Sequence, residues 1–464
     1  MWSATTIVIG TIIGSTIFMK PATMAGQLGS PALLITVWIV AGSISLFGAM
    51  AFAELGTMFP ETGGQYVYLR KAYGDFVAYL YGWASIAVVN TAAIAAIAFV
   101  CAEYAGHLMY LPRFDQHTEN SVVLHIPMIG NILPLQNFGV KVLAIAIILV
   151  LTLANYLSVR LGNSVQFIST LLKAVALVIL VFGILFSGKG STRNFVTNSN
   201  SFHLSGWSLF AAFMAATTGA FASYDGWNNL GMVGGEIKDP DKNITKSLLG
   251  GVFACIIIYV LVSLAYMYAL PIDEMAASPL VASDATTKVY GSAGGMILAV
   301  LIVISTFGAT SLNLLANSRI IFAMAEAKSF FPWTGKIHPR FQTPGNSVVV
   351  LGVWSSIFVI SGSFDVLADM FVFVSWIFYG LVVCAVFILR KMSPDIQRPY
   401  KVMGYPLVPV IFVSFTAFYL VTTVYNDITN YHLGKAPFIN SVLGLVLTAI
   451  GIPLFFYFRR KNKN

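Results

Sequence analysis

The sequence predicts an all-α integral membrane protein, and three observations support this fold class. First, the 464 residues are 58% hydrophobic and only 9% charged, whereas a typical soluble domain carries about 25% charged residues. Second, the apolar residues fall into about twelve runs, each long enough to cross a bilayer as a helix. Third, the lysines and arginines are distributed asymmetrically over the loops between these runs. Most of the chain is therefore expected to be solvated by lipid.

The apolar runs follow one another along the whole chain, and no loop between them is long enough to hold a soluble domain. We expect membrane spans at residues 4–27, 33–58, 76–104, 138–157, 163–187, 208–234, 246–270, 292–325, 346–362, 366–390, 405–425 and 438–458. The first span has no basic segment before it and is followed by further spans, so it is not a signal peptide. Residues 1–464 are expected to form a single polytopic membrane domain.

The net charge of +8 reflects membrane topology and not nucleic-acid binding. With the N-terminus inside, seventeen of the 26 lysines and arginines lie in cytoplasmic segments and six lie in outer segments. The other three, Lys20, Lys173 and Arg319, lie within or at the ends of spans. Because cytoplasmic loops carry an excess of basic residues, the asymmetry places both termini in the cytoplasm. We expect no nucleic-acid partner.

Enzymatic and metal-binding functions find little support in the sequence. The three cysteines, Cys101, Cys255 and Cys384, all lie in expected spans and are too few for a disulfide framework. The six histidines are scattered without zinc-ligand spacing. There is no nucleophile elbow, phosphate loop or reactive pair of carboxylates. We therefore expect no catalytic residue, no metal and no cofactor.

The first span contains a break. Gly10 and Gly14 are four residues apart, a spacing that also occurs where helices pack closely. Ser15 and Thr16 follow directly, and together these residues make a stretch that can unwind. Unpaired backbone groups at membrane depth survive only where they line a cavity. Where the helix restarts, free N–H groups and the positive end of the helix dipole can bind a carboxylate.

A second broken span lies at residues 208–234. We expect its helix to stop near Phe221 and Ala222, where its last carbonyl groups would be unpaired and would suit an ammonium group. Gly226 permits the turn that follows. Two such broken spans, each opening a block of five helices, indicate the midplane binding site of a secondary transporter.

Three side chains at the second break are also informative. Tyr224 and Trp227 offer large surfaces to a bound side chain, although they could equally be ordinary packing aromatics. Asp225 is harder to explain structurally, because an aspartate at membrane depth is costly and by default functional or water-facing. We expect Asp225 to lie at the unwound segment, on the aqueous path.

The order of the motifs gives a specific resemblance. The strings GTIIGSTIF at 10–18, PETGGQYVYLRKAYG at 60–74, YDGWNNLGMVGGEIKDP at 224–240, FGATSLNLLANSRIIFAMAEA at 307–327 and HPRFQTP at 338–344 follow one another over nearly the whole chain. In this order they resemble the amino acid–polyamine–organocation superfamily, and within it the L-amino acid transporter family. The resemblance implies a five-plus-five inverted-repeat fold, with the first repeat at 4–187, the second at 208–390 and two additional helices at 405–458.

The resemblance also implies a set of substrate-binding residues. Those matching the family's carboxylate-binding stretch are Thr11, Ile12, Ile13, Gly14, Ser15 and Thr16. Those matching positions near the amino group and side chain are Ala222, Ser223, Asp225, Asn228 and, on the seventh helix, Tyr259. The substrates implied are L-amino acids, carried by alternating access.

The chain departs from the family pattern at two positions. The family usually has Gly-Ser-Gly where this chain has Gly14-Ser15-Thr16, so a methyl and a hydroxyl enter a space normally left empty. A gating phenylalanine usually stands where this chain has Ala222, and Phe221 comes one place earlier. Either Phe221 moves into the gate position through a local shift of the helix, or the gate closes less tightly in this chain than in the family.

Lys173 interrupts the apolar fifth span about ten residues from its start, roughly 15 Å at the helical rise. That depth disfavours a lysine that reaches back to the membrane surface. Lys173 matches a family lysine whose ammonium reaches the first and eighth helices, where sodium-driven relatives hold a metal ion. A fixed cation would make sodium unnecessary. Because desolvation lowers the pKa of a lysine, a proton-coupled cycle stays open.

The leading expectation is a sodium-independent exchanger of small neutral L-amino acids in the plasma membrane. A proton-coupled amino acid symporter is the alternative in the same class, and a channel or non-transporting membrane subunit is the alternative in another. Some animal members of the family bind a glycoprotein through a cysteine between the third and fourth helices. Residues 105–137 contain no cysteine, so no disulfide-linked heavy subunit is expected. Glu54 ends the second span, and its partner is not identified by the sequence.

Overall fold

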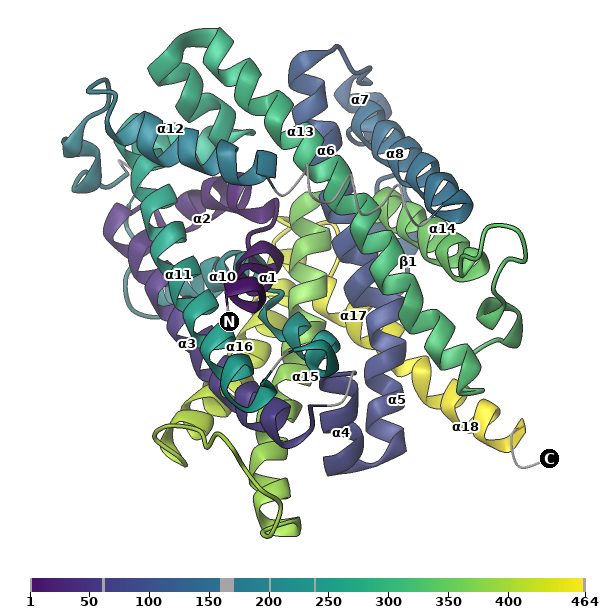
Figure 1. The fold of residues 1–464 in the computed structure, drawn as a ribbon. Helices are drawn as coiled ribbons and strands as arrows, with labels where there is room; N and C mark the ends of the chain where they lie inside the picture. The colour runs from purple at the N-terminus through teal and green to yellow at the C-terminus, as the bar shows by residue number, and fades with distance from the viewer. Residues whose placement is uncertain (1, 61–62, 159–170, 200–201, 238, 462–464) are drawn as a thin grey trace. The chain divides into compact units, whose positions relative to one another are not determined.

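The structure is a computed structural model that describes residues 2–60, 63–158, 171–199, 202–237 and 239–461. Helices make up nearly all of its regular structure (Figure 1). Within the described residues the only sheet is a hairpin, in which β1 (Leu124–Ile126) pairs antiparallel with β2 (Gly130–Ile132). The all-α class expected from the composition is confirmed.

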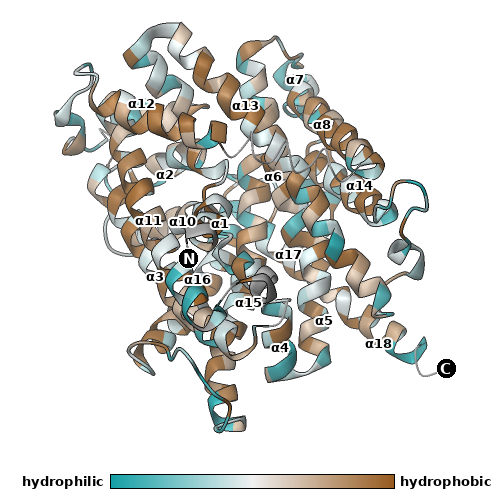
Figure 2. Ribbon diagram, viewed as in Figure 1, coloured by the Kyte–Doolittle hydropathy of each residue, from teal (hydrophilic) through white to brown (hydrophobic). Residues whose placement is uncertain are grey.

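Eight helical segments of the described chain are long and apolar enough to cross a membrane. They are α3 (Pro31–Met58), the run of α5 (Asp75–Ala84), a π-helical turn (Ser85–Val89) and α6 (Asn90–Leu108), then α8 (Phe138–Leu157), α11 (Pro240–Ala269), α13 (Val281–Glu326), α15 (Phe364–Met392), α16 (Leu407–His432), and the run of α17 (Asn440–Ala449) and α18 (Gly451–Lys461). Hydrophobic residues cover much of the length of α11 and α13 (Figure 2). A multi-pass membrane protein follows from these segments.

The other helical segments are shorter. They are α1 (Trp2–Ile12), η1 (Thr16–Phe18), α2 (Lys20–Leu28), α4 (Gln65–Tyr73), α7 (Gln116–Glu119), the apolar helix Leu171–Gly183, η4 (Thr192–Phe195), α10 (Gly206–Tyr224), η5 (Trp227–Glu236), α12 (Ile272–Ala277), η6 (Pro332–Gly335) and α14 (Gly345–Ser361). Of the expected span 163–187, residues 163–170 lie outside the described residues. The expected span 292–325 lies inside α13, where Gly291, at φ +75°, separates it from an additional N-terminal segment.

The chain divides into two compact units. The first unit contains residues 1–81, 191–278 and 375–426, and the second contains 82–190, 279–374 and 427–464. In the first unit α11 packs against α1 and α3, and α10 packs against α2 and α3. In the second, α6, α8, α13 and α14 pack against one another. All the substrate-site residues expected from the sequence lie in the first unit, and Lys173 lies in the second.

A buried ion-pair cluster, which we call the Glu54 clamp, joins α3 to the end of α15 and to the segment between α15 and α16 within the first unit. The Glu54 carboxylate, whose side chain is only 1% exposed, accepts hydrogen bonds from Arg390 Nε (2.8 Å) and Nη2 (2.6 Å). It also accepts one from the Val402 N–H (2.7 Å), and Arg398 Nε lies 3.8 Å away. These groups identify the partners that the sequence left unknown.

Candidate functional site

The first break is shorter than the sequence indicated. Gly10, Thr11 and Ile12 remain in α1, and the Ile13 N–H still donates to the Ile9 carbonyl at 2.9 Å. The Thr11 hydroxyl donates to carbonyls of the same helix, at 2.9 and 3.0 Å. The backbone bond from Ile13 to Ile9 continues the helix through Ile12, and the expected unwinding of residues 10–12 is wrong for that reason.

Beyond Ile13 the hydrogen-bond pattern changes. The Phe18 N–H donates to Ser15 O and the Met19 N–H donates to Thr16 O, both at 3.1 Å, so the three-residue spacing replaces the four-residue spacing of an α-helix. The α-helix resumes at Lys20. The N–H groups of Gly14 and Ser15 therefore stand outside any α-helical ladder, at the start of the second half of the span. Groups in such a position attract an anion.

Thr16 lies in this segment, and 8% of its surface is exposed. Its hydroxyl is buried and has no hydrogen-bond partner among the described residues. The same oxygen would lie 3.7 Å from a Cβ atom built on Gly14. The hydroxyl thus lies close to the broken backbone and has an unused hydrogen-bonding capacity.

The second break begins later than expected. Instead of stopping near Phe221 and Ala222, α10 continues to Tyr224, and Asp225 then adopts an extended conformation. The Ser223 hydroxyl donates to Gly219 O (3.1 Å), and the Tyr224 hydroxyl donates to Trp38 O on α3 (3.0 Å). These contacts hold the last turn of α10 in place, which the sequence pattern alone did not indicate.

Gly226 brings the two breaks together. Its φ of +108° is a conformation that side chains disfavour. A Cβ atom at this position would also lie 2.6 Å from the Thr11 carbonyl oxygen and 3.0 Å from its carbon. The backbone that follows α10 is therefore in direct contact with the end of α1, and only glycine allows that approach.

Tyr259 on α11 bridges the ends of the two helices. Its fully buried hydroxyl lies 2.9 Å from the Ile12 carbonyl oxygen and 2.7 Å from the Ser223 carbonyl oxygen, and its one proton can be donated to either. Each carbonyl oxygen has two lone pairs, so each can still accept a bond from a ligand. The geometry thus places the carbonyl groups of Ile12 and Ser223 beside the backbone amides of the first break, where the Gly14 N–H donates to the Tyr259 hydroxyl oxygen.

Phe221 and Ala222, the two residues near the expected gate, have different surroundings. The Phe221 ring stacks on Trp376 of α15 with centroids 3.5 Å apart, and it meets Tyr419 of α16 at 5.3 Å. Ala222 is buried, with 5% of its surface exposed. In this structure the Phe221 ring is thus part of an aromatic cluster with α15 and α16.

Asp225 and Asn228 belong to a hydrogen-bonded chain that includes two residues the sequence did not reveal. The Tyr379 hydroxyl lies 2.5 Å from Asp225 Oδ1 and 3.2 Å from Asn228 Oδ1. Asn228 Nδ2 lies 3.3 Å from Gln65 Oε1. Tyr379 stands in an otherwise apolar segment of α15, and Gln65 follows Gly63-Gly64 at the start of α4. Neither has a sequence signal that connects it to residue 225.

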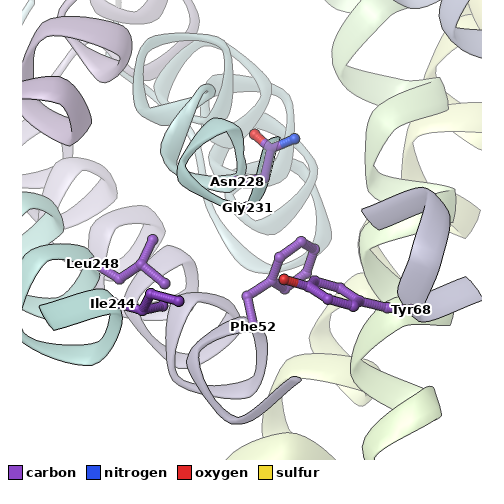
Figure 3. A pocket seen from close by; sticks show the side chains of 6 residues that line it. All are labelled: Phe52, Tyr68, Asn228, Gly231, Ile244 and Leu248. Carbon is purple, nitrogen blue, oxygen red and sulfur yellow. The ribbon is translucent and has the colours of Figure 1, made fainter. Parts of the chain in front are cut away.

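A small pocket lies beside this chain. It is lined by Phe52, Tyr68, Asn228, Gly231, Ile244 and Leu248. Figure 3 shows the Asn228 amide on one side of the pocket, with the rings of Phe52 and Tyr68 on the other. Burial raises the pKa of Tyr68 well above its ordinary value, so its hydroxyl stays protonated. The pocket is mostly apolar, with one amide and one hydroxyl at its border.

Lys173 lies in the helix Leu171–Gly183 of the second unit and is half-buried. Within the described residues, no group of three or more His, Cys, Asp or Glu side chains could hold a metal ion. The polar groups of the first-unit site are backbone amides and carbonyls, hydroxyls, amides and one carboxylate. This set suits a small zwitterion.

Comparison with known proteins gives a consistent result. The family described as amino acid permease matches residues 1–448. The chain is 30% identical to the serine/threonine exchanger SteT of Bacillus subtilis, over 99% of this chain and 96% of that protein. It is also 30% identical to the human b(0,+)-type amino acid transporter 1 (95% and 85%). Its identity with the human large neutral amino acids transporter small subunit 2 is again 30% (99% and 81%).

Proposed function

This chain belongs to the amino acid permease family, and from that premise we propose that it exchanges small neutral L-amino acids across the plasma membrane without sodium. Transport proceeds by alternating access in a five-plus-five inverted-repeat fold of twelve spans. The interruptions after Ile12 and Tyr224 are the unwound segments of that fold.

The observation that carries this proposal is the contact between the two breaks. The Ser15 N–H and the unpartnered Thr16 hydroxyl offer donors to a carboxylate. The Ile12 and Ser223 carbonyls, held by Tyr259, offer acceptors to an ammonium group. An α-amino acid carries a carboxylate and an ammonium group within a few ångströms of each other, so it matches this pair of donors and acceptors.

Fewer residues support the proposals about the substrate's side chain and about what drives transport. The serine/threonine specificity in the name of the Bacillus subtilis relative favours a small neutral substrate. Lys173 supplies a fixed cation in place of sodium, and a symporter that uses the proton of Lys173 is the second candidate. The absence of cysteine in residues 105–137 favours a transporter that works without a disulfide-linked heavy subunit. A channel or a non-transporting subunit would not need two opposed helix ends.

Counterflow in proteoliposomes tests the proposal. Labelled L-serine or L-alanine is expected to enter vesicles only when an unlabelled amino acid is inside, with and without sodium. Uptake into empty vesicles driven by a sodium gradient would overturn the exchange mechanism. Uptake into empty vesicles driven by a pH gradient would select the proton-coupled alternative, and no specific flux of any amino acid would count against a transporter.

A further inference from the structure

Asp225 presents a problem for a site that takes neutral substrates. It directly precedes Gly226, the residue in contact with the end of α1, so a carboxylate lies one residue from the point where the two breaks meet. An uncompensated carboxylate in such a place would favour a substrate with a cationic side chain. Something in the protein must therefore engage this charge.

Tyr379 is the group that engages it. A hydroxyl has one proton, and at 2.5 Å from Asp225 Oδ1 against 3.2 Å from Asn228 Oδ1 the proton goes to the carboxylate. Hydrogen bonds to ionised acceptors are shorter and stronger than those to neutral ones. Tyr379 is 3% exposed and its ring contacts Trp227 and Phe52, so its hydroxyl is held in a fixed direction.

The amides behind Tyr379 complete a polarised chain. With the proton of Tyr379 on Asp225, Asn228 Oδ1 faces an oxygen that cannot donate to it, and Gln65 Nε2 is buried without a partner in the described part of the chain. Rotating both amides by 180° gives each contact along the chain one donor and one acceptor, because partners decide the orientation of an amide. The Gln65 Oε1 then takes the buried position that Nε2 occupied. Gln65 Nε2 then donates to Asn228 Oδ1, Asn228 Nδ2 donates to Tyr379 Oη, and Tyr379 donates to Asp225.

We propose that Tyr379, supported by Asn228 and Gln65, is a positioning residue that holds the Asp225 carboxylate toward α15 and thereby sets the charge of the side chain that the site accepts. The inference rests on the proposed amino acid transport. All four residues belong to the first unit. When the Tyr379 hydroxyl donates to the Asp225 carboxylate, a substrate with a neutral side chain meets no uncompensated charge. Without Tyr379, the carboxylate is available to an ammonium or guanidinium group.

The test compares Tyr379→Phe with wild type in proteoliposomes, using inhibition constants for L-alanine and L-lysine against labelled L-alanine or L-serine. The alanine-to-lysine ratio of inhibition constants is expected to rise about tenfold or more in the variant, as for the loss of a hydrogen bond to a charged group. Tyr73→Phe is the matched control. It also removes a tyrosine hydroxyl that contacts α15, the one bonded to Leu381 O at 2.8 Å, and its ratio is expected to stay at the wild-type value.

A second pair of variants separates positioning from general disturbance. In the Asp225→Asn background there is no carboxylate to release, so adding Tyr379→Phe should leave the ratio unchanged. An equal shift in that background would overturn the inference, as would a wild-type ratio in a Tyr379→Phe protein that still binds alanine. If Tyr379→Phe is not recovered as folded protein, Gln65→Met should shift the ratio the same way by a smaller factor, and no shift would count against the chain.

The two proposals fail in different ways. A wild-type protein that exchanges alanine, combined with an unchanged ratio in Tyr379→Phe, overturns only the role of Tyr379. A wild-type protein that neither binds nor exchanges any amino acid overturns the proposed function, and the inference falls with it.

Discussion

Thr16 is the residue where the chain departs from the family pattern inside the first break, and the structure gives the departure a physical meaning. A buried hydroxyl without a partner costs about 1–3 kcal/mol, and the Thr16 hydroxyl is in that condition among the described residues. A substrate carboxylate would remove the cost. Its methyl group occupies space that glycine would leave empty.

Replacing Thr16 with glycine is expected to broaden substrate acceptance. The loss of one or two well-packed groups changes discrimination by roughly 1–3 kcal/mol, or about 10- to 200-fold, so leucine should gain relative to alanine. The ratio of their inhibition constants measures the effect. Thr16→Ser is the control, because it keeps the hydroxyl and removes only the methyl group. An unchanged ratio in Thr16→Gly would place residue 16 outside the substrate pocket.

Replacing Lys173 with alanine is expected to reduce the transport rate strongly while leaving the protein folded and inserted in the membrane. The proposed role of its ammonium is to substitute for a metal ion, so substrate affinity should fall from at least one side of the membrane. Lys189→Ala is the control, since Lys189 donates to the Val289 carbonyl in the same unit (3.0 Å). Wild-type rates and affinities from both sides in Lys173→Ala would make this lysine purely structural.

The Glu54 clamp determines how the end of α3 is joined to the segment between α15 and α16. Arg390 binds the carboxylate through two nitrogens and stacks on Tyr405 at 3.7 Å. Arg398 donates to the carbonyls of Leu389 and Ser393, at 3.1 and 2.7 Å. The two arginines thus fix the chain that leaves α15. A buried pair of this kind does not guarantee net stabilisation, but breaking it is costly.

Glu54→Gln is expected to destabilise the protein by about 3 kcal/mol, near the lower end for breaking a buried ion pair. The loss stays near that lower end because the Arg390 guanidinium keeps its contact with the Tyr405 ring. Thermal unfolding of the detergent-solubilised protein measures this. Asp75→Asn is the matched control, since it breaks the exposed Arg70–Asp75 pair, whose side chains are 61% and 71% exposed. Exposed pairs contribute little. Equal melting temperatures for wild type and Glu54→Gln would show that the Glu54 clamp does not stabilise the protein.

At the scale of the whole molecule, the expected spans of the two halves of the chain can be compared by the unit to which each belongs. The first and second expected spans belong to the first unit, and the third, fourth and fifth belong mostly to the second. The sixth and seventh again belong to the first unit, and the eighth and ninth to the second. The first four spans of each half therefore lie in corresponding units, as the proposed repeats require, whereas the fifth lies in the second unit and most of the tenth, residues 375–390, lies in the first.

The excess of basic residues in alternate loops predicts the orientation of the molecule. In a protein whose three cysteines are replaced by serine, a cysteine at Lys435 should react with a membrane-impermeant maleimide on intact cells. A cysteine at Lys336 should react only after permeabilisation. Both side chains are exposed in the structure, so access depends on the side of the membrane. The opposite pattern would invert the topology and place the termini outside.

The sequence by itself determined the family, which the comparisons confirm, and the membrane class, which the eight long apolar helical segments confirm. These features depend on local composition and order: apolar runs, glycines at the breaks, and motifs in a fixed sequence. The same local signals placed the breaks at residues 10–16 and 222–227, within about one helical turn of the observed helix ends.

Only the tertiary structure decided where the helices end and what their ends contact. Helix α1 continues to Ile12 and α10 continues to Tyr224, which the glycine positions do not predict. Tyr259, 36 residues from Ser223 and 247 from Ile12, joins the two ends. Glu54 and Asp225 find Arg390 and Tyr379 more than 150 residues away. Partners so distant in the chain meet through helix packing, and no local pattern specifies that.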